Sequence, residues 1–456
     1  MKHLDAWSAL ITEKRFAALK NELLSLPSPD LAEELSDAPL PYALLFFRLL
    51  PKENAAEVFS YMGKERRHAL ISAFSDKELR ILTEELFLDD CADLVEEMPA
   101  TVVTRLLAAA APETRRQLNE LLRYPDNSAG SIMTTEFVML RPEMTVEDAF
   151  AKIRREAIDK ETVYTAYIVD GARHLIGTVS AKELLLASPD KAVGEIFRPN
   201  ALSVNTGDDR EDVARMFDKY DLLALPVVDA EERLVGIVTV DDAIDVLQAE
   251  AEEDFQVMAA ITPTDTPYLR TSTLKLYLAR IPWLCILLLS ATLTGAIISS
   301  FEAALAASTV LAAFIPMLMG TGGNAGSQAS VVVIRGLSLG EIEPRDVFRV
   351  LWKELRVAVL TSLTLAVLAF LKVILIDGFL FGSIETHLYE TAFVVSAALL
   401  LTVVAALLIG GLLPVLAKAL RLDPAVMASP FITTIVDAVA LLVYFYIASA
   451  ALLPLL

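Results

Sequence analysis

Residues 315–330 read IPMLMGTGGNAGSQAS, and this stretch decides how the rest of the chain is interpreted. It lies inside an uncharged run, 303–334, that is long enough to cross a membrane, since a span needs about 20 mostly apolar residues. Irregular backbone at that depth is tolerated only where protein or water covers it. We therefore expect a broken or closely packed helix that turns the Asn324 amide toward an aqueous path. Helix packing by small residues is the competing interpretation.

Four more apolar stretches of sufficient length flank this one, at 281–301, 357–376, 391–417 and 425–456. Together they predict a five-helix transmembrane domain over residues 281–456. An odd number of spans puts the two ends of this domain on opposite sides of the membrane.

The distribution of basic residues predicts the orientation, because cytoplasmic loops near span ends are enriched in Lys and Arg. Such residues gather in the loops after the second and fourth spans: Arg335, Arg345, Arg349, Lys353, Arg356, Lys418 and Arg421. The loop after the third span holds Asp377, Glu385 and Glu390 and no Lys or Arg. The first residues also lack the apolar core of a signal peptide. We expect a multi-pass protein of the inner cell membrane, with a cytoplasmic N-terminus and an external C-terminus.

The fifth span contains a carboxylate, Asp437, near its middle. A charge at this depth costs on the order of 2.5–3.5 kcal/mol on insertion scales, so a water-facing functional role is the default expectation. The alternative is a buried ion pair, for which Lys372 is the one candidate inside a predicted span. We expect Asp437 to be an acidic pore residue, with Thr433 one turn earlier adding a hydroxyl to the same face. Back-bonding of that hydroxyl to its own helix is an equal alternative.

The formal charge of −21 is confined to the first part of the chain. Residues 276–456 carry nine Lys or Arg and ten Asp or Glu, which leaves 30 basic and 50 acidic residues, a net of −20, in residues 1–275. Such a charge disfavours nucleic acid as a partner and favours cations. The two cysteines, Cys91 and Cys285, make no metal or disulfide spacing and are interpreted as small hydrophobic residues.

An internal repeat occupies residues 131–250. TAYIVD at 165–170 matches ALPVVD at 224–229, and LIGTVSAKELL at 175–185 matches LVGIVTVDDAI at 234–244, both at an offset of 59. Each copy reads as a helix, two strands and a second helix, which resembles a tandem pair of α/β CBS domains at 131–196 and 197–250. Such pairs often bind adenine nucleotides, and the resemblance puts Thr239 and Asp242 at an ATP site. Helix capping by Thr239 is the alternative.

Residues 1–130 are helical by pattern, and AAEVFSYM at 55–62 recurs as CADLVEEM at 91–98. This offset of 36 predicts stacked helix pairs in an all-α superhelical domain. Acidic residues lie on one helix face here and in a run, 250–254, that follows the CBS pair. Solvated acidic faces are the usual interpretation, but like charges at domain boundaries are costly unless a cation such as Mg²⁺ bridges them.

The order of these parts resembles the MgtE family of magnesium channels over essentially the whole chain. The most specific segments are PMLMGTGGNAGSQ at 316–328 and DPAVMASPFITTIVD at 423–437. The resemblance implies a homodimer in membrane lipid and a connecting plug helix at 251–280. It places the pore at Asp437, Gly322, Gly323 and Asn324. It places Mg²⁺-sensing acids at Asp89, Asp93, Asp221, Asp242, Glu250, Glu253, Asp254, Glu57 and Glu211.

The resulting hypothesis is Mg²⁺ import through a channel that closes when internal Mg²⁺ binds the acidic cytosolic domains. The sequence does not rank Mg²⁺ against Co²⁺, Mn²⁺ or Ca²⁺. Two alternatives stay open: a non-conducting membrane sensor regulated by its CBS pair, and an ion-coupled secondary transporter of divalent cations. An enzyme is the least favoured class, because the four histidines are scattered and no nucleophile–base pair or phosphate loop is found.

Overall fold

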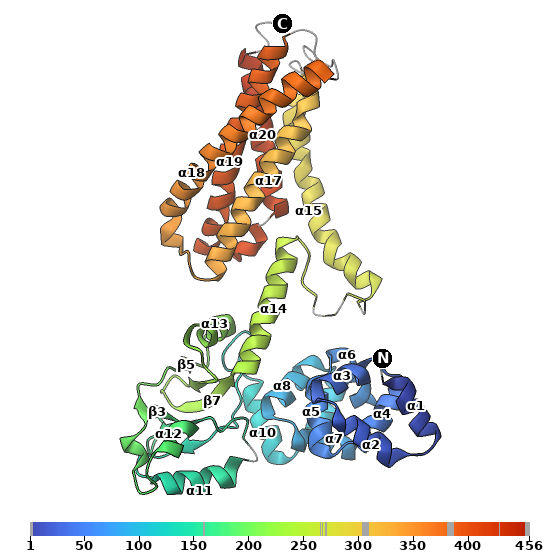
Figure 1. The fold of residues 1–456 in the computed structure, drawn as a ribbon, viewed down its shortest axis with the longest axis vertical. Coiled ribbons are helices and arrows are strands. Elements are labelled where there is room, and N and C mark those ends of the chain that lie inside the picture. The colour runs from blue at the N-terminus through green and yellow to red at the C-terminus, as the bar shows by residue number, and fades with distance from the viewer. Residues whose placement is uncertain are drawn as a thin grey trace. The chain divides into compact units, whose positions relative to one another are not determined.

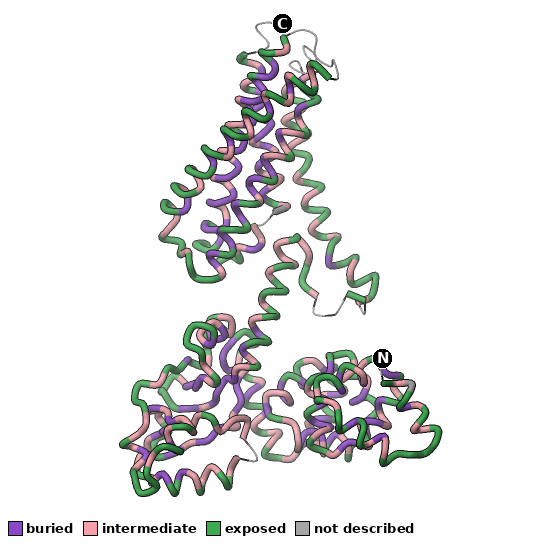
Figure 2. Tube along the Cα trace, in the orientation of Figure 1, coloured by how far each residue is buried: buried purple, intermediate pink, exposed green. Residues whose placement is uncertain are grey.

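A computed structural model of the chain describes residues 3–157, 160–264, 266, 268–269, 271–302, 310–380, 387–427 and 429–451. The chain divides into two compact units, Met1–Gln248 and Ala249–Leu456, and Figure 1 shows the elements of each. In both units the buried residues follow the sides of elements that pack on their neighbours (Figure 2). The fold is the expected multidomain one: an all-α domain, an α/β CBS pair and a set of long apolar helices.

The first unit begins with ten short helices. They are α1 (Leu4–Thr12), α2 (Phe16–Ser25), α3 (Ser28–Asp37), α4 (Leu40–Leu49), α5 (Lys52–Ser60), α6 (Lys64–Ala73), α7 (Asp76–Glu85), α8 (Leu88–Glu97), α9 (Ala100–Ala109) and α10 (Pro112–Leu121). Each helix after α1 begins 12 residues after the one before it. Pro27, Pro39, Pro51 and Pro99 stand immediately before helices α3, α4, α5 and α9, where a fixed φ and a missing N–H suit a helix start.

The expected repeat of helix pairs is wrong. The offset of 36 relates α5 to α8, which are three helices apart, so the repeating element is one helix and its linker. Helices two apart pack on each other, as α3 does on α5 and α5 on α7. Arginine side chains connect helices that are apart in sequence. Arg66 of α6 donates to the carbonyls of Leu35 and Ala38 at the end of α3, at 2.6 and 2.5 Å. These bonds satisfy carbonyls that a helix end leaves without partners.

The duplicated α/β region follows. One sheet has the order β1 (Met139–Leu140), β2 (Thr165–Val169), β3 (Leu175–Ser180), β4 (Arg198–Pro199), and the other β5 (Val204–Asn205), β6 (Ala224–Val228), β7 (Leu234–Thr239). In each copy a parallel pair precedes an antiparallel pair with the same register, Thr165 opposite Ser180 and Ala224 opposite Thr239. The helices are α11 (Val146–Glu156), α12 (Ala181–Leu186), α13 (Arg210–Tyr220) and α14 (Val240–Met258), with a short turn at Val193–Glu195. The two-copy prediction is confirmed.

The second unit contains α15 (Thr273–Ser300), α17 (Val310–Ser338), α18 (Val347–Lys372), α19 (Leu388–Ala419) and α20 (Ser429–Ala451). A π-helical segment, Val373–Leu380, continues α18, and single turns at Pro344–Asp346 and Pro424–Met427 precede α18 and α20. Four helical segments in the described residues are long and apolar enough to cross a membrane: Thr273–Ser300, Pro344–Leu380, Leu388–Ala419 and Pro424–Ala451. The remaining predicted span, 303–334, corresponds to α17, whose small and polar residues lower its hydropathy, so the count of five stays a prediction. Residues 303–309 of that span, and Glu385, lie outside the described residues.

The connection between the CBS pair and the apolar helices differs from the single helix expected over 251–280. Helix α14 continues from the second CBS copy to Met258, and α15 begins only at Thr273. The acidic run at 250–254 therefore lies in the last turns of α14. Residues 273–280, expected in the connecting helix, form the start of the first apolar helix.

Candidate functional site

Helix α17 packs on α19 and α20 through glycines, with no space for side chains. A Cβ at Gly322 would lie 2.7 Å from Thr402 Cγ2, and one at Gly323 would lie 2.8 Å from Thr433 Cγ2. A Cβ at Gly410 of α19 would lie 2.2 Å from the backbone oxygen of Gly326. Helix α17 is continuous from Val310 to Ser338. The predicted close packing is therefore present, without a break, and small-residue packing accounts for Gly322 and Gly323.

Asp437 lies half-buried in α20, one residue after Val436, which packs on Gly322. Its Oδ1 atom is shielded from solvent and has no hydrogen-bond partner among the described residues. Lys372 is not that partner, because its Nζ donates to both carboxylate oxygens of Asp377, at 3.0 and 2.7 Å. A carboxylate oxygen that is shielded from water and has no partner is costly. An ion or water is the kind of partner that would relieve this cost.

Hydroxyl groups of α17 and α20 meet one turn before Asp437. Ser327 Oγ and Thr433 Oγ1 lie 3.4 Å apart. The neighbouring Thr434 instead donates to the carbonyl of Pro430 in its own helix, at 3.1 Å. Asn324 is exposed in this single chain and is free to contact solvent or another subunit. Ser327 was missed as a site residue, although its place in the small and polar stretch of α17 was a usable signal.

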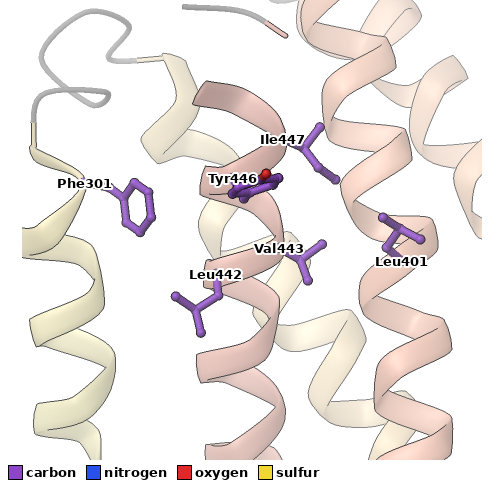
Figure 3. A pocket seen from close by; sticks show the side chains of 6 residues that line it. All are labelled: Phe301, Leu401, Leu442, Val443, Tyr446 and Ile447. Carbon is purple, nitrogen blue, oxygen red and sulfur yellow. The ribbon is translucent and has the colours of Figure 1, made fainter. Parts of the chain in front are cut away.

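An apolar pocket lies farther along α20, bordered by α15 and α19. Figure 3 shows its lining by Phe301, Leu401, Leu442, Val443, Tyr446 and Ile447. Only the Tyr446 hydroxyl supplies a side-chain polar atom there. A hard cation needs several oxygen ligands, so this pocket is not an ion site.

A second candidate region lies inside the first unit, where α8 meets the start of α14. Burial, then repulsion from Asp89 and Asp93, raises the pKa of Asp90 to about 7. Desolvation by surrounding protein, then repulsion from Glu97, Asp89 and Glu96, raises the pKa of Asp93 to about 6. Burial raises the pKa of Asp89, and Asp241 adds to the effect. The two predicted acids of α8, Asp89 and Asp93, thus lie among several carboxylates. We call this group the acidic cluster: Asp89, Asp90, Asp93, Asp241, Asp242, Glu136 and Glu161.

The acidic cluster extends to α14 and to the loop before β2. Burial followed by repulsion from Asp89 raises the pKa of Asp242 well above its usual range. Burial, then repulsion from Asp89, Asp241, Asp242 and Glu136, raises the pKa of Glu161 to about 9. Oε2 of Glu161 is shielded and has no hydrogen-bond partner among the described residues. Asp90, Asp241, Glu136 and Glu161 were missed, because chain spacing gives no sign that α8, α14 and this loop converge.

The chemistry of the acidic cluster fits a divalent cation. Carboxylate oxygens are the ligands that Mg²⁺ prefers, and a positive charge would offset the repulsion that adds to burial in raising these pKa values. In the described part of the chain, no three acidic, His or Cys side chains are arranged as a ready metal site. Mg²⁺ commonly binds one or two carboxylates and keeps several waters, so a ready three-ligand cage is not required.

The end of α14 holds a smaller acidic group in the second unit. Burial, then repulsion from Asp423, raises the pKa of Asp254, and Glu250 and Glu253 add to the effect. Ser338 at the end of α17 donates to Asp254 Oδ2 at 3.4 Å. Asp423, in the loop before α20, was not predicted as a partner of this group.

The remaining predicted acids stand apart from these groups. Asp221 ends α13 in the left-handed conformation, with φ of 52°. Glu211 forms an ion pair with Arg215 one turn later in the same helix. Glu57 is exposed on α5. The structure does not bring these three carboxylates into the acidic cluster.

The predicted nucleotide residues form a local hydrogen bond. Thr239 Oγ1 donates to Asp242 Oδ2 at 2.6 Å at the start of α14. In the first copy, Ser180 and Glu183 form a capping box at the start of α12. Helix capping therefore explains the positions of the first copy, and the second copy has a side-chain hydrogen bond between the corresponding residues. Asp242 belongs to the acidic cluster as well.

Known families match most of the chain. Residues 315–447 match the MgtE family, described as divalent cation transporter, and residues 26–127 match the MgtE intracellular N domain. Residues 129–190 and 193–249 match the CBS domain.

Several proteins similar to this chain are named as magnesium transporters or channels. The magnesium transporter MgtE of Thermus thermophilus is 39% identical over 435 residues, 94% of each chain. The magnesium transporter MgtE of Bacillus subtilis is 33% identical over 90% of this chain and 91% of its own. A crystal structure of the cytosolic domain of the Mg²⁺ channel MgtE in complex with ATP is 39% identical, with a TM-score of 0.50 over 52% of this chain and 98% of that one.

Proposed function

The chain belongs to the MgtE family, and from this premise we propose that it transports Mg²⁺ across a membrane through a path that includes Asp437. The observation that carries the proposal is the unpartnered Oδ1 of this carboxylate among apolar helices. A carboxylate within a membrane span costs free energy, and binding of a transported ion would explain why it is present.

The path is proposed to run along the face of α20 that carries Thr433 and Asp437. Mg²⁺ gives up its water reluctantly, so carboxylates from two subunits would hold a largely hydrated ion. Asn324 is exposed in one chain and would line the same path in a homodimer. Gly322 and Gly323 allow α17 to approach α20, so their role is to position the path.

Entry is proposed to be passive and driven by concentration and membrane potential. The potential acts on a divalent cation with about 4.6 kcal/mol per 100 mV, twice the single-charge value. We propose an inner-membrane location with the acidic N-terminal unit in the cytoplasm and the C-terminus outside.

The acidic cluster is proposed to sense internal Mg²⁺. Without a cation, burial and then repulsion between its carboxylates raise the pKa values of Asp90, Asp93 and Glu161. Ions that bind more tightly to the compact arrangement shift the population toward it as internal Mg²⁺ rises. Asp254, with Glu250 and Glu253, is proposed to take part at the end of α14, and Asp221, Glu211 and Glu57 at separate positions. The result is negative feedback on uptake.

ATP is proposed as a ligand of the CBS pair. The support is the similar cytosolic domain solved in complex with ATP. Thr239 and Asp242 are the candidate contacts, and their mutual hydrogen bond would have to open or rearrange.

Reconstitution into liposomes tests the proposal. Purified protein should admit Mg²⁺ down its own gradient when the pH and Na⁺ gradients are abolished. Flux that needs either gradient would favour a coupled secondary transporter. Absence of flux from folded protein would favour a non-conducting sensor. Parallel measurements with Co²⁺, Mn²⁺ and Ca²⁺ would give the selectivity.

A further inference from the structure

An apolar groove of about 480 Å³ lies between α18 and α19. Four α18 residues between Phe348 and Leu355 line one side, and three α19 residues between Leu408 and Leu412 line the other. The two helices run alongside each other in Figure 1. Phe348 and Trp352 are 82% and 60% exposed, so the groove is open on the outer surface of the helix group.

The groove lies where α18 changes from charged to apolar. The last charge before its long apolar stretch is Arg356, one residue after the groove ends. On α19 the groove residues precede Lys418 by six to ten positions, or about 9–15 Å of helix rise. Trp352 is typical of the membrane–water interface. The groove is therefore at the depth where a lipid acyl chain meets its headgroup.

Basic side chains border the groove along α18. Arg349, Lys353 and Arg356 are spaced by four and three residues, which places them on one side of the helix, next to Trp352. All three are exposed. Arg349 also donates to Asp346 at 2.9 Å, and Arg356 Nε donates to the Trp352 carbonyl at 3.4 Å.

Glu354, the acidic residue in the same turns of α18, does not lie beside the basic residues. A Cβ at Gly411 of α19 would lie 2.9 Å from Glu354 Cγ, so Glu354 is directed toward α19 and away from the basic row. The exposed side is thus positive beside an apolar groove. This combination complements a phosphate joined to an acyl chain.

We propose that this groove binds an anionic phospholipid, with an acyl chain along Phe348–Leu355 and the phosphate at Arg349, Lys353 and Arg356. The proposal rests on the membrane placement of α18 and α19 assumed for the proposed function. A second copy of the chain fits less well, because a two-fold contact here would bring two basic rows together. Anionic lipids enrich the cytoplasmic leaflet, the side on which these basic residues are expected.

The test measures lipid retained by the purified full chain in native mass spectrometry. The probes are phosphatidylglycerol and phosphatidylcholine with the same acyl chains. Wild-type protein should retain phosphatidylglycerol preferentially. Lys353→Gln/Arg356→Gln should lower its retention about 10-fold, with little change for phosphatidylcholine. The matched control Lys275→Gln/Arg280→Gln removes two basic residues from α15 and should keep the preference.

A second variant keeps the test informative about the groove itself. Leu408→Trp fills the groove from α19 and leaves the basic row intact, so it should reduce retention of phosphatidylglycerol. Unchanged retention in both site variants would overturn the proposal, as would equal retention of the two lipids by wild type. A change from dimer to monomer in the variants would assign the groove to a second copy and also overturn it. Mg²⁺ flux is not a readout here, so failure of the transport proposal would be seen separately.

Discussion

Asp437 and the acidic cluster place carboxylates in opposite situations. Asp437 stands among apolar helices, and its shielded Oδ1 has no hydrogen-bond partner among the described residues. In the acidic cluster seven carboxylates from α8, α14 and two loops crowd together, and their mutual repulsion adds to burial in raising several pKa values. Both arrangements are costly without a cation. A single carboxylate suits a transported ion that binds briefly. A group of carboxylates suits Mg²⁺ sensing, because bound ions would hold α8, α14 and the two loops together.

The largest expected effect is at the solitary carboxylate. Asp437→Asn removes the charge and keeps the shape, and a lost ion contact of about 2.7 kcal/mol corresponds to roughly 100-fold lower Mg²⁺ flux. Liposome uptake measures this. Glu390→Gln, in the first turn of α19, is the control and should conduct as wild type. Normal uptake by Asp437→Asn would reject this residue as part of the path.

The second prediction concerns the packing that positions Asp437. Gly410→Ala would bring a methyl group against the Gly326 backbone oxygen, which cannot move away as a side chain can. The cost should be about 1–3 kcal/mol, measured as a lower melting temperature and reduced flux. Gly320→Ala, where a Cβ meets open space, is the matched control and should melt as wild type or slightly higher. Equal melting of the two variants would contradict the packing account.

The third prediction concerns Glu161 of the acidic cluster, whose pKa is raised by burial and then by repulsion from neighbouring carboxylates. The pKa of Glu161 is about 9 in the folded chain, so this state holds a proton that the unfolded chain releases near pH 4.5. Ion-free stability should therefore fall as pH rises from about 5 to 9, by at most about 1.4 kcal/mol per pH unit for this group. Melting temperatures in chelator should fall less steeply for Glu161→Gln, and Mg²⁺ should flatten the wild-type curve.

The control for this titration is Glu84→Gln, which removes an exposed carboxylate paired with Arg80 in α7. Its melting temperature should follow the wild-type dependence on pH. If Glu161→Gln also follows the wild-type dependence on pH, the pKa of Glu161 is not raised in the folded chain, and this prediction is contradicted.

The smallest expected effect is at a carboxylate that is fully partnered. Burial alone would raise the pKa of Glu78, but hydrogen bonds from Arg48 and Ser75 lower it to about 2. A lowered pKa adds stability above about pH 4.5 that is lost as pH falls toward 2. Glu78→Gln should cost about 1 kcal/mol near pH 7 and less near pH 3, measured by hydrogen exchange of α7. An unchanged exchange rate at pH 7 would show that the cap contributes nothing.

The sequence predicted most of the fold and only part of the site. The CBS copies followed from a 59-residue offset, since the strand sequences recur at that spacing, and the strands pair in the same register in both copies. The prediction of a helix-pair repeat was wrong, because a 36-residue offset is equally compatible with three single-helix units of 12 residues and with one pair of longer helices. Asp89, Asp93 and Asp242 were found by motif. Glu161 and Asp90 were missed, because the meeting of carboxylates depends on how α8, α14 and the loop before β2 pack, which no local pattern encodes.

The central claim is that the two carboxylate regions act separately, Asp437 in conduction and the acidic cluster in closure. Mg²⁺ flux through Asp89→Asn/Asp242→Asn protein in liposomes, with Mg²⁺ varied on the cytosolic side, tests this directly. At low cytosolic Mg²⁺ the variant should conduct as wild type, and at high Mg²⁺ it should be inhibited far less. Loss of flux at low Mg²⁺, or inhibition equal to that of wild type, would contradict the account.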